Sequence, residues 1–231
     1  FSTLELLPLI FILYEAIGQY RAMSETGFPY KLPFMFIVAS GIWNFVGAGV
    51  LGFFINLPLI NYYEHGTYLT VAHGHAAMFG AFGMLALGIG IYVLRVTTTG
   101  WSERRLWWSF WLWNVGLAVM VGASLLPIGF LQLETAFTAG YDAARSLAFY
   151  ERPLVQTFFW LRFPGDTLLI AGTAIFFGDA LAKIRKRRPA TPSAEAGPGA
   201  LAIKGPSESP ADDGTGATAS GSAGSGGEGN G

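Results

Sequence analysis

The sequence has no cysteine among its 231 residues. Without thiols the chain forms no disulfide, ligates no iron–sulfur cluster through cysteine and attaches no c-type haem through a C-x-x-C-H motif. Any haem in this chain is therefore held non-covalently. Charged residues are also scarce, at 13%, against roughly 25% in a typical soluble domain. This deficit indicates a membrane protein. The net charge of −1 says little about partners, and no nucleic-acid partner is expected.

The first twenty residues lack the features of a cleavable signal peptide. They have no basic start and no small-residue cleavage site, and they carry Glu5 and Glu15. Phe1 is not an initiator methionine, so we interpret the chain as the C-terminal part of a longer protein.

Long apolar runs dominate the remaining sequence. A helix needs about 20 mostly apolar residues to cross a bilayer, and five stretches meet this length. They are residues 1–20, 34–57, 67–94, 106–134 and 153–182. We predict an all-α integral membrane protein in which residues 1–188 form a bundle of five transmembrane helices. Residues 189–231, rich in Gly, Ser, Ala and Pro, are predicted to form a disordered tail.

Basic residues predict how this bundle is oriented. If "KIRKRR" at 183–188 is cytoplasmic, the connections at 21–33 and 95–105 are cytoplasmic too, and together these segments hold ten Lys and Arg residues. The outer connections hold only Arg145 and Arg152. Because basic residues concentrate in cytoplasmic loops, the tail is predicted to be inside and the outer end of the third span faces outward.

Two histidines, His73 and His75, lie near that outer end. Residues on a helix are rotated by about 100° each, so these two side chains point to opposite sides and cannot both bind one metal ion. Each can ligate a separate centre, and haem is the planar group that a buried histidine commonly ligates. Gly74 and neighbouring small residues leave bare backbone for a flat macrocycle. The alternative is ordinary packing by small residues around a hydrogen-bonded histidine.

The sequence around the histidines resembles a known family. "HGTYLTVAHGHAAMFGAFG" resembles the tenth helix of the catalytic subunit of the haem–copper oxidase superfamily, in which an H-x-H pair ligates two haems. "NLPLINYYEHGTYLTVAHGH" is more similar to nitric oxide reductases than to oxygen reductases, and "FSTLELLPL" resembles their eighth helix. "YDAARSLAFYERPLVQTFFWLR" resembles the quinol-dependent branch, in which one fused chain replaces the cytochrome c partner. The resemblance extends over nearly all of residues 1–188.

This resemblance implies specific roles for three residues. His73 would ligate the high-spin haem b3, His75 would ligate the low-spin haem b, and Glu5 would be the carboxylate near the haem b3–non-haem iron pair. The ligands of the non-haem iron are expected outside this chain. The implied reaction reduces two NO to N2O with electrons from quinol, in a bacterial cytoplasmic membrane. The implied partners are the lipid bilayer and the missing N-terminal helices, in the same protein or a split subunit, and a homodimer is compatible.

Four further charged residues have two interpretations each. Asp166 lies near the outer end of the fifth span, and Arg162 lies one helical turn earlier. They form either a structural ion pair or, as the quinol-dependent resemblance suggests, a polar contact for quinol. Arg145 and Arg152 lie in the outer connection, near the depth expected for haem propionates, and arginine suits carboxylates. Alternatively, they are solvated loop charges.

Two other functions remain open at this stage. The first is a haem–copper oxygen reductase, whose common type has a lysine in the helix that corresponds to residues 1–20. This chain has none there and has Glu5 instead, which favours NO chemistry. The second is a non-catalytic, truncated membrane bundle in which the histidines bind no haem.

Overall fold

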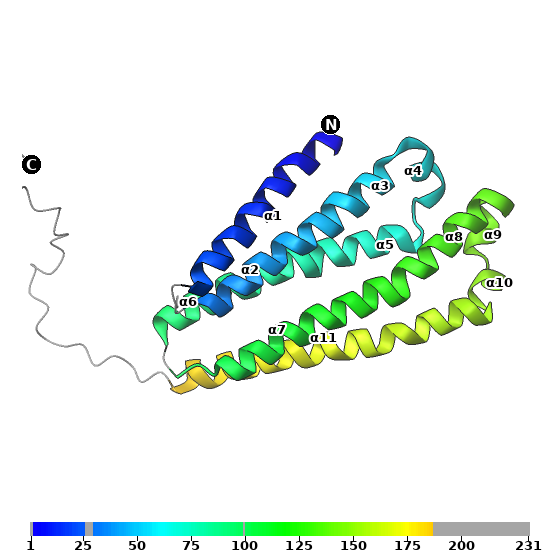
Figure 1. Cartoon of the computed structure of the whole chain (residues 1–231). Helices are drawn as coiled ribbons and strands as arrows, with labels where there is room; N and C mark the ends of the chain where they lie inside the picture. The colour runs from blue at the N-terminus through cyan, green and yellow to red at the C-terminus, as the bar shows by residue number, and fades with distance from the viewer. Residues whose placement is uncertain (1, 26–29, 99, 187–231) are drawn as a thin grey trace, which may run out of the picture. The chain divides into compact units, whose positions relative to one another are not determined.

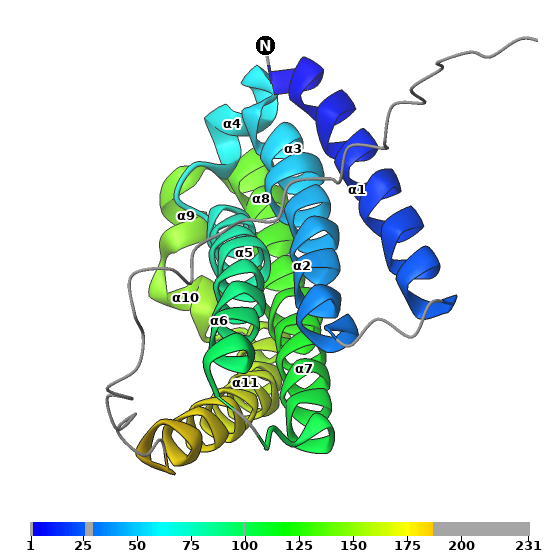
Figure 2. The same ribbon diagram turned by 90° about the vertical axis from the view of Figure 1, so that its left-hand side faces the viewer.

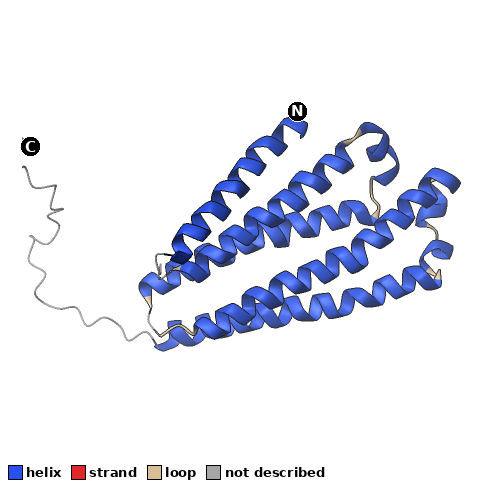
Figure 3. Cartoon of the chain, in the orientation of Figure 1, coloured by secondary structure: helices blue, strands red, loops and turns tan. Residues whose placement is uncertain are grey.

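The computed structural model describes residues 2–25, 30–98 and 100–186, and every regular element among them is a helix (Figures 1 and 3). The elements are α1 Ser2–Glu25, α2 Lys31–Trp43, η1 Asn44–Leu51, α3 Gly52–Asn56, α4 Pro58–Glu64, α5 Tyr68–His75, η2 Ala76–Gly83, α6 Met84–Thr97, α7 Glu103–Ala118, η3 Val119–Leu125, α8 Leu126–Ala139, α9 Tyr141–Arg145, α10 Leu147–Tyr150 and α11 Pro153–Lys186. The predicted all-α fold is confirmed. The predicted tail, 189–231, lies outside the described residues.

Four continuous helices are long and apolar enough to cross a membrane within the described residues. They are Lys31–Asn56, Tyr68–Thr97, Glu103–Ala139 and Pro153–Arg185, and they match the last four predicted spans. The first predicted span, 1–20, is also a helix, α1, but it is not among the four. Within the described residues, four spans and the long helix α1 therefore stand where five spans were predicted.

Three of these spans contain a π-helical segment near the middle: η1, η2 and η3. A π segment shifts the hydrogen-bond register by one residue and often occurs at functional sites. In η1, for example, the Gly52 N–H donates to the Gly47 carbonyl, five residues back. The apolar runs predicted unbroken α-helical spans, and their hydrophobic pattern gave no sign of the π segments.

Short helices replace the irregular connections expected at one end of the bundle. Helix α4 occupies the connection before α5, and α9 and α10 occupy the connection before α11 (Figure 1). Gly66 and Gly140 have positive φ angles of 73° and 89°, a conformation that glycine adopts without steric cost. These glycines turn the chain sharply into the helices that follow.

Close backbone contacts hold the spans together. Helix α11 runs along α7 and η3, and α1 lies beside α2 at the edge of the bundle (Figure 2). A Cβ atom built on Gly116 would lie 2.8 Å from the Gly165 carbonyl oxygen, so only glycine permits this approach of α7 to α11. Apolar side chains such as Phe36, Met84 and Leu117 fill the interior. Many other apolar side chains are exposed, as expected for surfaces that face lipid.

Candidate functional site

His73 is held by the neighbouring span. Its Nδ1 atom lies 2.8 Å from the carbonyl oxygen of Gly47 in η1. Because a carbonyl only accepts hydrogen bonds, Nδ1 carries the proton and donates. A Cβ atom on Gly52 would lie 3.3 Å from Cε1 of the same ring. The His73 ring is therefore seated against the bare backbone of the second span.

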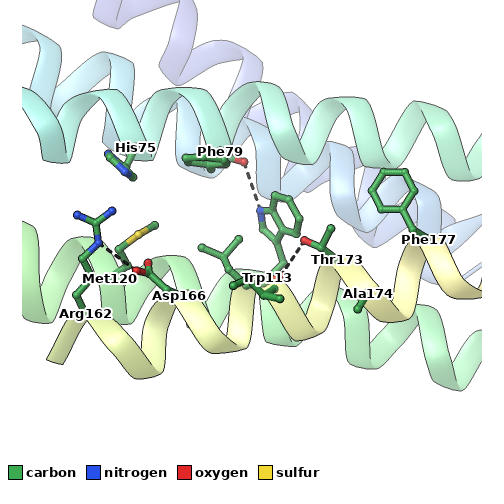
Figure 4. A pocket seen from close by; sticks show the side chains of 11 residues that line it. His75, Phe79, Trp113, Met120, Arg162, Asp166, Thr173, Ala174 and Phe177 are labelled. Carbon is green, nitrogen blue, oxygen red and sulfur yellow. Dashed lines mark hydrogen bonds and ion pairs between the residues drawn. The ribbon is translucent and has the colours of Figure 1, made fainter. Parts of the chain in front are cut away.

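His75 is held by its own helix. Its Nδ1 atom lies 2.8 Å from the carbonyl oxygen of Val71, one turn earlier, and donates to it. The ring lines a cavity of about 500 Å³ whose walls come from α5, η2, α7, η3 and α11 (Figure 4). The two rings thus lie on different sides of the helix, as their spacing predicts.

Both histidines have the tautomer that a metal ligand requires. With Nδ1 protonated and bonded to a carbonyl, Nε2 is unprotonated and can donate its lone pair to a metal. No described residue makes a hydrogen bond to either Nε2 atom. The fixed Nδ1 atoms also set the ring orientations. These donors fit two separate haem irons, one on each side of α5.

The cavity beside His75 combines apolar walls with one ion pair. Arg162 Nε lies 3.1 Å from Asp166 Oδ2, so the predicted pairing is confirmed. Both residues lie on α11, across the cavity from His75 (Figure 4). The remaining lining residues are Phe79, Trp113, Met120, Leu169, Ile170, Thr173, Ala174 and Phe177. Such a cavity suits a flat apolar group with polar substituents at one end.

A second cavity, of about 400 Å³, lies between α1 and the second span. Gly52, which contacts the His73 ring, lines it together with Leu6 and Leu9 of α1. The start of α1 therefore lies at the level of His73. Glu5 immediately precedes Leu6 in α1, but its side chain lies outside the described part of the chain.

The small residues on either side of His75 have different surroundings. A Cβ atom on Gly74 would meet nothing within 4 Å, whereas one on Gly80 would lie 2.6 Å from the Trp43 ring. Ala76 and Ala77 are also buried against η1. Of the bare backbone expected to face a macrocycle, Gly74 stays open, while Ala76, Ala77 and Gly80 pack against the second span.

Arg145 binds atoms of the connecting segments, and Arg152 binds the end of α8. Arg145 donates to the carbonyl oxygen of His65 and stacks on Tyr141, with its guanidinium carbon 4.2 Å from the ring centre. Arg152 donates to Thr135 Oγ1 at 3.3 Å. Neither residue lines the two cavities described above.

Two buried polar residues near the histidines, Gln132 and Glu64, were not predicted from the sequence. Gln132 is fully buried, and its Oε1 accepts from the Tyr68 N–H at 2.7 Å, at the start of α5. Glu64, in α4, is also buried and accepts a hydrogen bond from Thr70 Oγ1 at 2.8 Å. Together they fix the beginning of the histidine helix. Gln132 lies inside the predicted span 106–134, which could have indicated its burial, whereas no sequence signal distinguished Glu64 from a solvated polar residue.

Two histidines that point to opposite sides of a membrane helix, each with an Nε2 atom free to bind a metal, are typical of haem-binding membrane proteins. Comparison with known proteins identifies the family. The family model of cytochrome c and quinol oxidase polypeptide I matches residues 1–168. The chain belongs to this family, whose membership implies haem cofactors. The chain is also similar to a nitric oxide reductase subunit from Stutzerimonas stutzeri, with 30% identity over 182 residues. That match covers 76% of this chain and 38% of the relative.

Proposed function

We propose that this chain is the C-terminal portion of a respiratory nitric oxide reductase of the quinol-dependent type. The reaction is 2 NO + 2 electrons + 2 protons → N2O + H2O. The observation that carries the proposal is the pair of opposed histidines, each with Nδ1 bonded to a backbone carbonyl. The similarity to the nitric oxide reductase of Stutzerimonas stutzeri supports NO over oxygen as the substrate.

His73 and His75 are the proposed haem ligands in this chain. His73 ligates the high-spin haem b3, and His75 ligates the low-spin haem b beside the cavity that it lines. The haems, when bound, supply one-electron redox chemistry. The protein supplies ligands in a fixed orientation, because the carbonyls of Gly47 and Val71 hold the two rings.

Charged residues complete the proposed cofactor and substrate contacts. Asp166 accepts a hydrogen bond from a quinol hydroxyl, and Arg162 orients its carboxylate. Arg145 and Arg152 are assigned to haem propionates that reach the outer connections, in addition to their loop contacts. Glu5 is assigned to proton delivery or charge balance beside haem b3.

The non-haem iron is proposed to bind outside this chain. No three His, Asp or Glu side chains gather as a metal site in the part of the chain that the structure describes. The chain spans 38% of the length of its nitric oxide reductase relative. We expect residues 1–231 to need the remaining helices, supplied by the same protein or a separate subunit. Purified alone, the chain should consume no NO, and turnover by the isolated chain would contradict this.

The bundle is assigned to the bacterial cytoplasmic membrane with the tail inside.

The experiment that tests the function records a reduced-minus-oxidised visible spectrum of the full-length protein and follows NO consumption on the same sample. Two b-type haems, one of which binds CO or NO, together with N2O production would support the proposal. Two haems with oxygen consumption and little NO turnover would instead indicate an oxygen reductase, the second candidate, which membership in the oxidase family favours. If the protein contains no haem, the remaining interpretation would be a non-catalytic membrane bundle.

A further inference from the structure

A buried carboxylate oxygen at the end of α11 has no partner within the described structure. Asp179 is 2% exposed, and its Oδ1 accepts from Arg105 Nη1 of α7 at 2.8 Å. Its Oδ2 is buried and makes no hydrogen bond. Buried polar atoms are nearly always hydrogen-bonded, so an unpaired carboxylate oxygen indicates a missing donor.

Asp179 and Arg105 both line a cavity of about 380 Å³ between α7 and α11. Trp108, Ala174, Ile175 and Gly178 complete its lining. The Arg105 side chain is 62% exposed, and its remaining guanidinium N–H groups bond to no described residue. The cavity therefore presents an accessible cation next to a carboxylate that needs a donor.

The surroundings of this cavity have the character of a membrane–water interface. Trp107, Trp108 and Trp111 are exposed, and exposed tryptophans typically sit at the headgroup level. Lys183, also near the end of α11, donates to the carbonyl of Gly100 in the turn before α7. A ligand at this depth is expected to have a polar headgroup and an apolar tail, as a phospholipid does.

We propose that this cavity binds the headgroup of phosphatidylethanolamine. Its phosphate accepts hydrogen bonds from Arg105, because guanidinium groups bind phosphate strongly. Its primary ammonium, with three N–H donors, supplies the donor that Asp179 Oδ2 lacks. Phosphatidylcholine matches the charges but has no N–H, and phosphatidylglycerol has no cation. The proposal is independent of the catalytic function assigned above.

The first experiment changes the lipid and not the protein. Delipidated full-length protein is titrated with phosphatidylethanolamine, its mono- and dimethyl derivatives, phosphatidylcholine and phosphatidylglycerol of matched acyl chains, and bound lipid is counted by native mass spectrometry. Binding should persist while one N–H remains and weaken by about tenfold at the trimethyl form, the scale of one charge-assisted hydrogen bond. Equal binding of phosphatidylethanolamine and phosphatidylcholine, or tighter binding of phosphatidylglycerol, would overturn the proposal.

The second experiment blocks the cavity without touching the ion pair. A Cβ atom on Gly178 meets nothing within 4 Å, so Gly178→Leu fits the helix and places its side chain in the cavity. This variant should lose the preference for phosphatidylethanolamine. Gly122→Leu is the matched control, because Gly122 is equally open and lies in η3, outside this cavity. If Gly178→Leu keeps the preference, the lipid does not bind here.

Discussion

At the scale of single residues, the orientation of each histidine ring depends on a different backbone carbonyl. His73 depends on a carbonyl of another span, whereas His75 depends on a carbonyl of its own helix. A change in the packing of the second span therefore reaches His73 directly. It reaches His75 only if α5 itself is distorted.

Replacing each histidine with alanine should remove one haem at a time from the full-length protein. His75→Ala should remove the low-spin signal, because the cavity beside it loses its ligand, and His73→Ala should remove the CO-binding high-spin signal. A haem count and a reduced-minus-oxidised spectrum measure both. His65→Ala is the control, since His65 is exposed and only its backbone carbonyl contacts Arg145. Unchanged spectra in both site variants would assign the histidines to packing.

Among the elements, the π segments η1 and η2 form a close backbone contact near the site. A Cβ atom on Gly47 would lie 2.7 Å from the Ala76 carbonyl carbon and 2.8 Å from the Ala77 nitrogen. Both neighbours are backbone, so neither can move aside as a side chain could. The same Gly47 carbonyl binds His73. The packing of the two segments and the orientation of the His73 ring therefore both depend on the position of Gly47.

Gly47→Ala should therefore lower stability and perturb only the His73 centre. We expect a loss of roughly 1–3 kcal/mol, as for overpacked cores, with a shifted high-spin spectrum and an unchanged low-spin spectrum. Thermal unfolding in detergent and the visible spectrum give the two readouts. Gly122→Ala, at an open position in η3, should not destabilise the protein. An equal shift of both haem signals would show that the effect is not transmitted through the Gly47 carbonyl.

Gln132 connects the start of the histidine helix to three other elements. Its Oε1 accepts from the Tyr68 N–H, and its Nε2 donates to the Ala144 carbonyl and the Tyr150 hydroxyl. Gln132→Leu leaves these buried groups unpaired, and we expect a loss of about 1–3 kcal/mol. Hydrogen exchange at residues 64–70 should also become faster. The control, Gln156→Leu, removes an exposed hydrogen bond to the Tyr150 carbonyl and should have little effect. Equal losses in the two variants would refute this role.

The elements also show which features the sequence alone could predict. The last four spans followed from long apolar runs, and the opposed directions of His73 and His75 followed from helical rotation. The π segments were not predictable, because a register shift of one residue leaves the hydrophobic pattern unchanged. The burial of Gln132 and Glu64 was missed because it arises from contacts between distant segments. Glu5 remains a prediction that rests on resemblance.

Across the whole bundle, polar contacts mark two distinct ends. At one end, Arg95 pairs with Glu103, and Lys183 binds the Gly100 carbonyl. At the other end, Arg145 binds the His65 carbonyl, beside the helix that carries the two histidines. The connections at the first end hold most of the basic residues. If basic residues stay in the cytoplasm, the histidines lie toward the outer surface.

Reporter insertions into the full-length protein test this orientation. Gly100 and Gly140 both lie in turns with positive φ, at opposite ends of the span Glu103–Ala139. Green fluorescent protein inserted at 100 should fluoresce and alkaline phosphatase there should be inactive, because the positively charged connection stays in the cytoplasm. Phosphatase inserted at 140 should be active. The reverse pattern would place His73 and His75 near the cytoplasm, and Asp166 would then meet quinol from the inner leaflet.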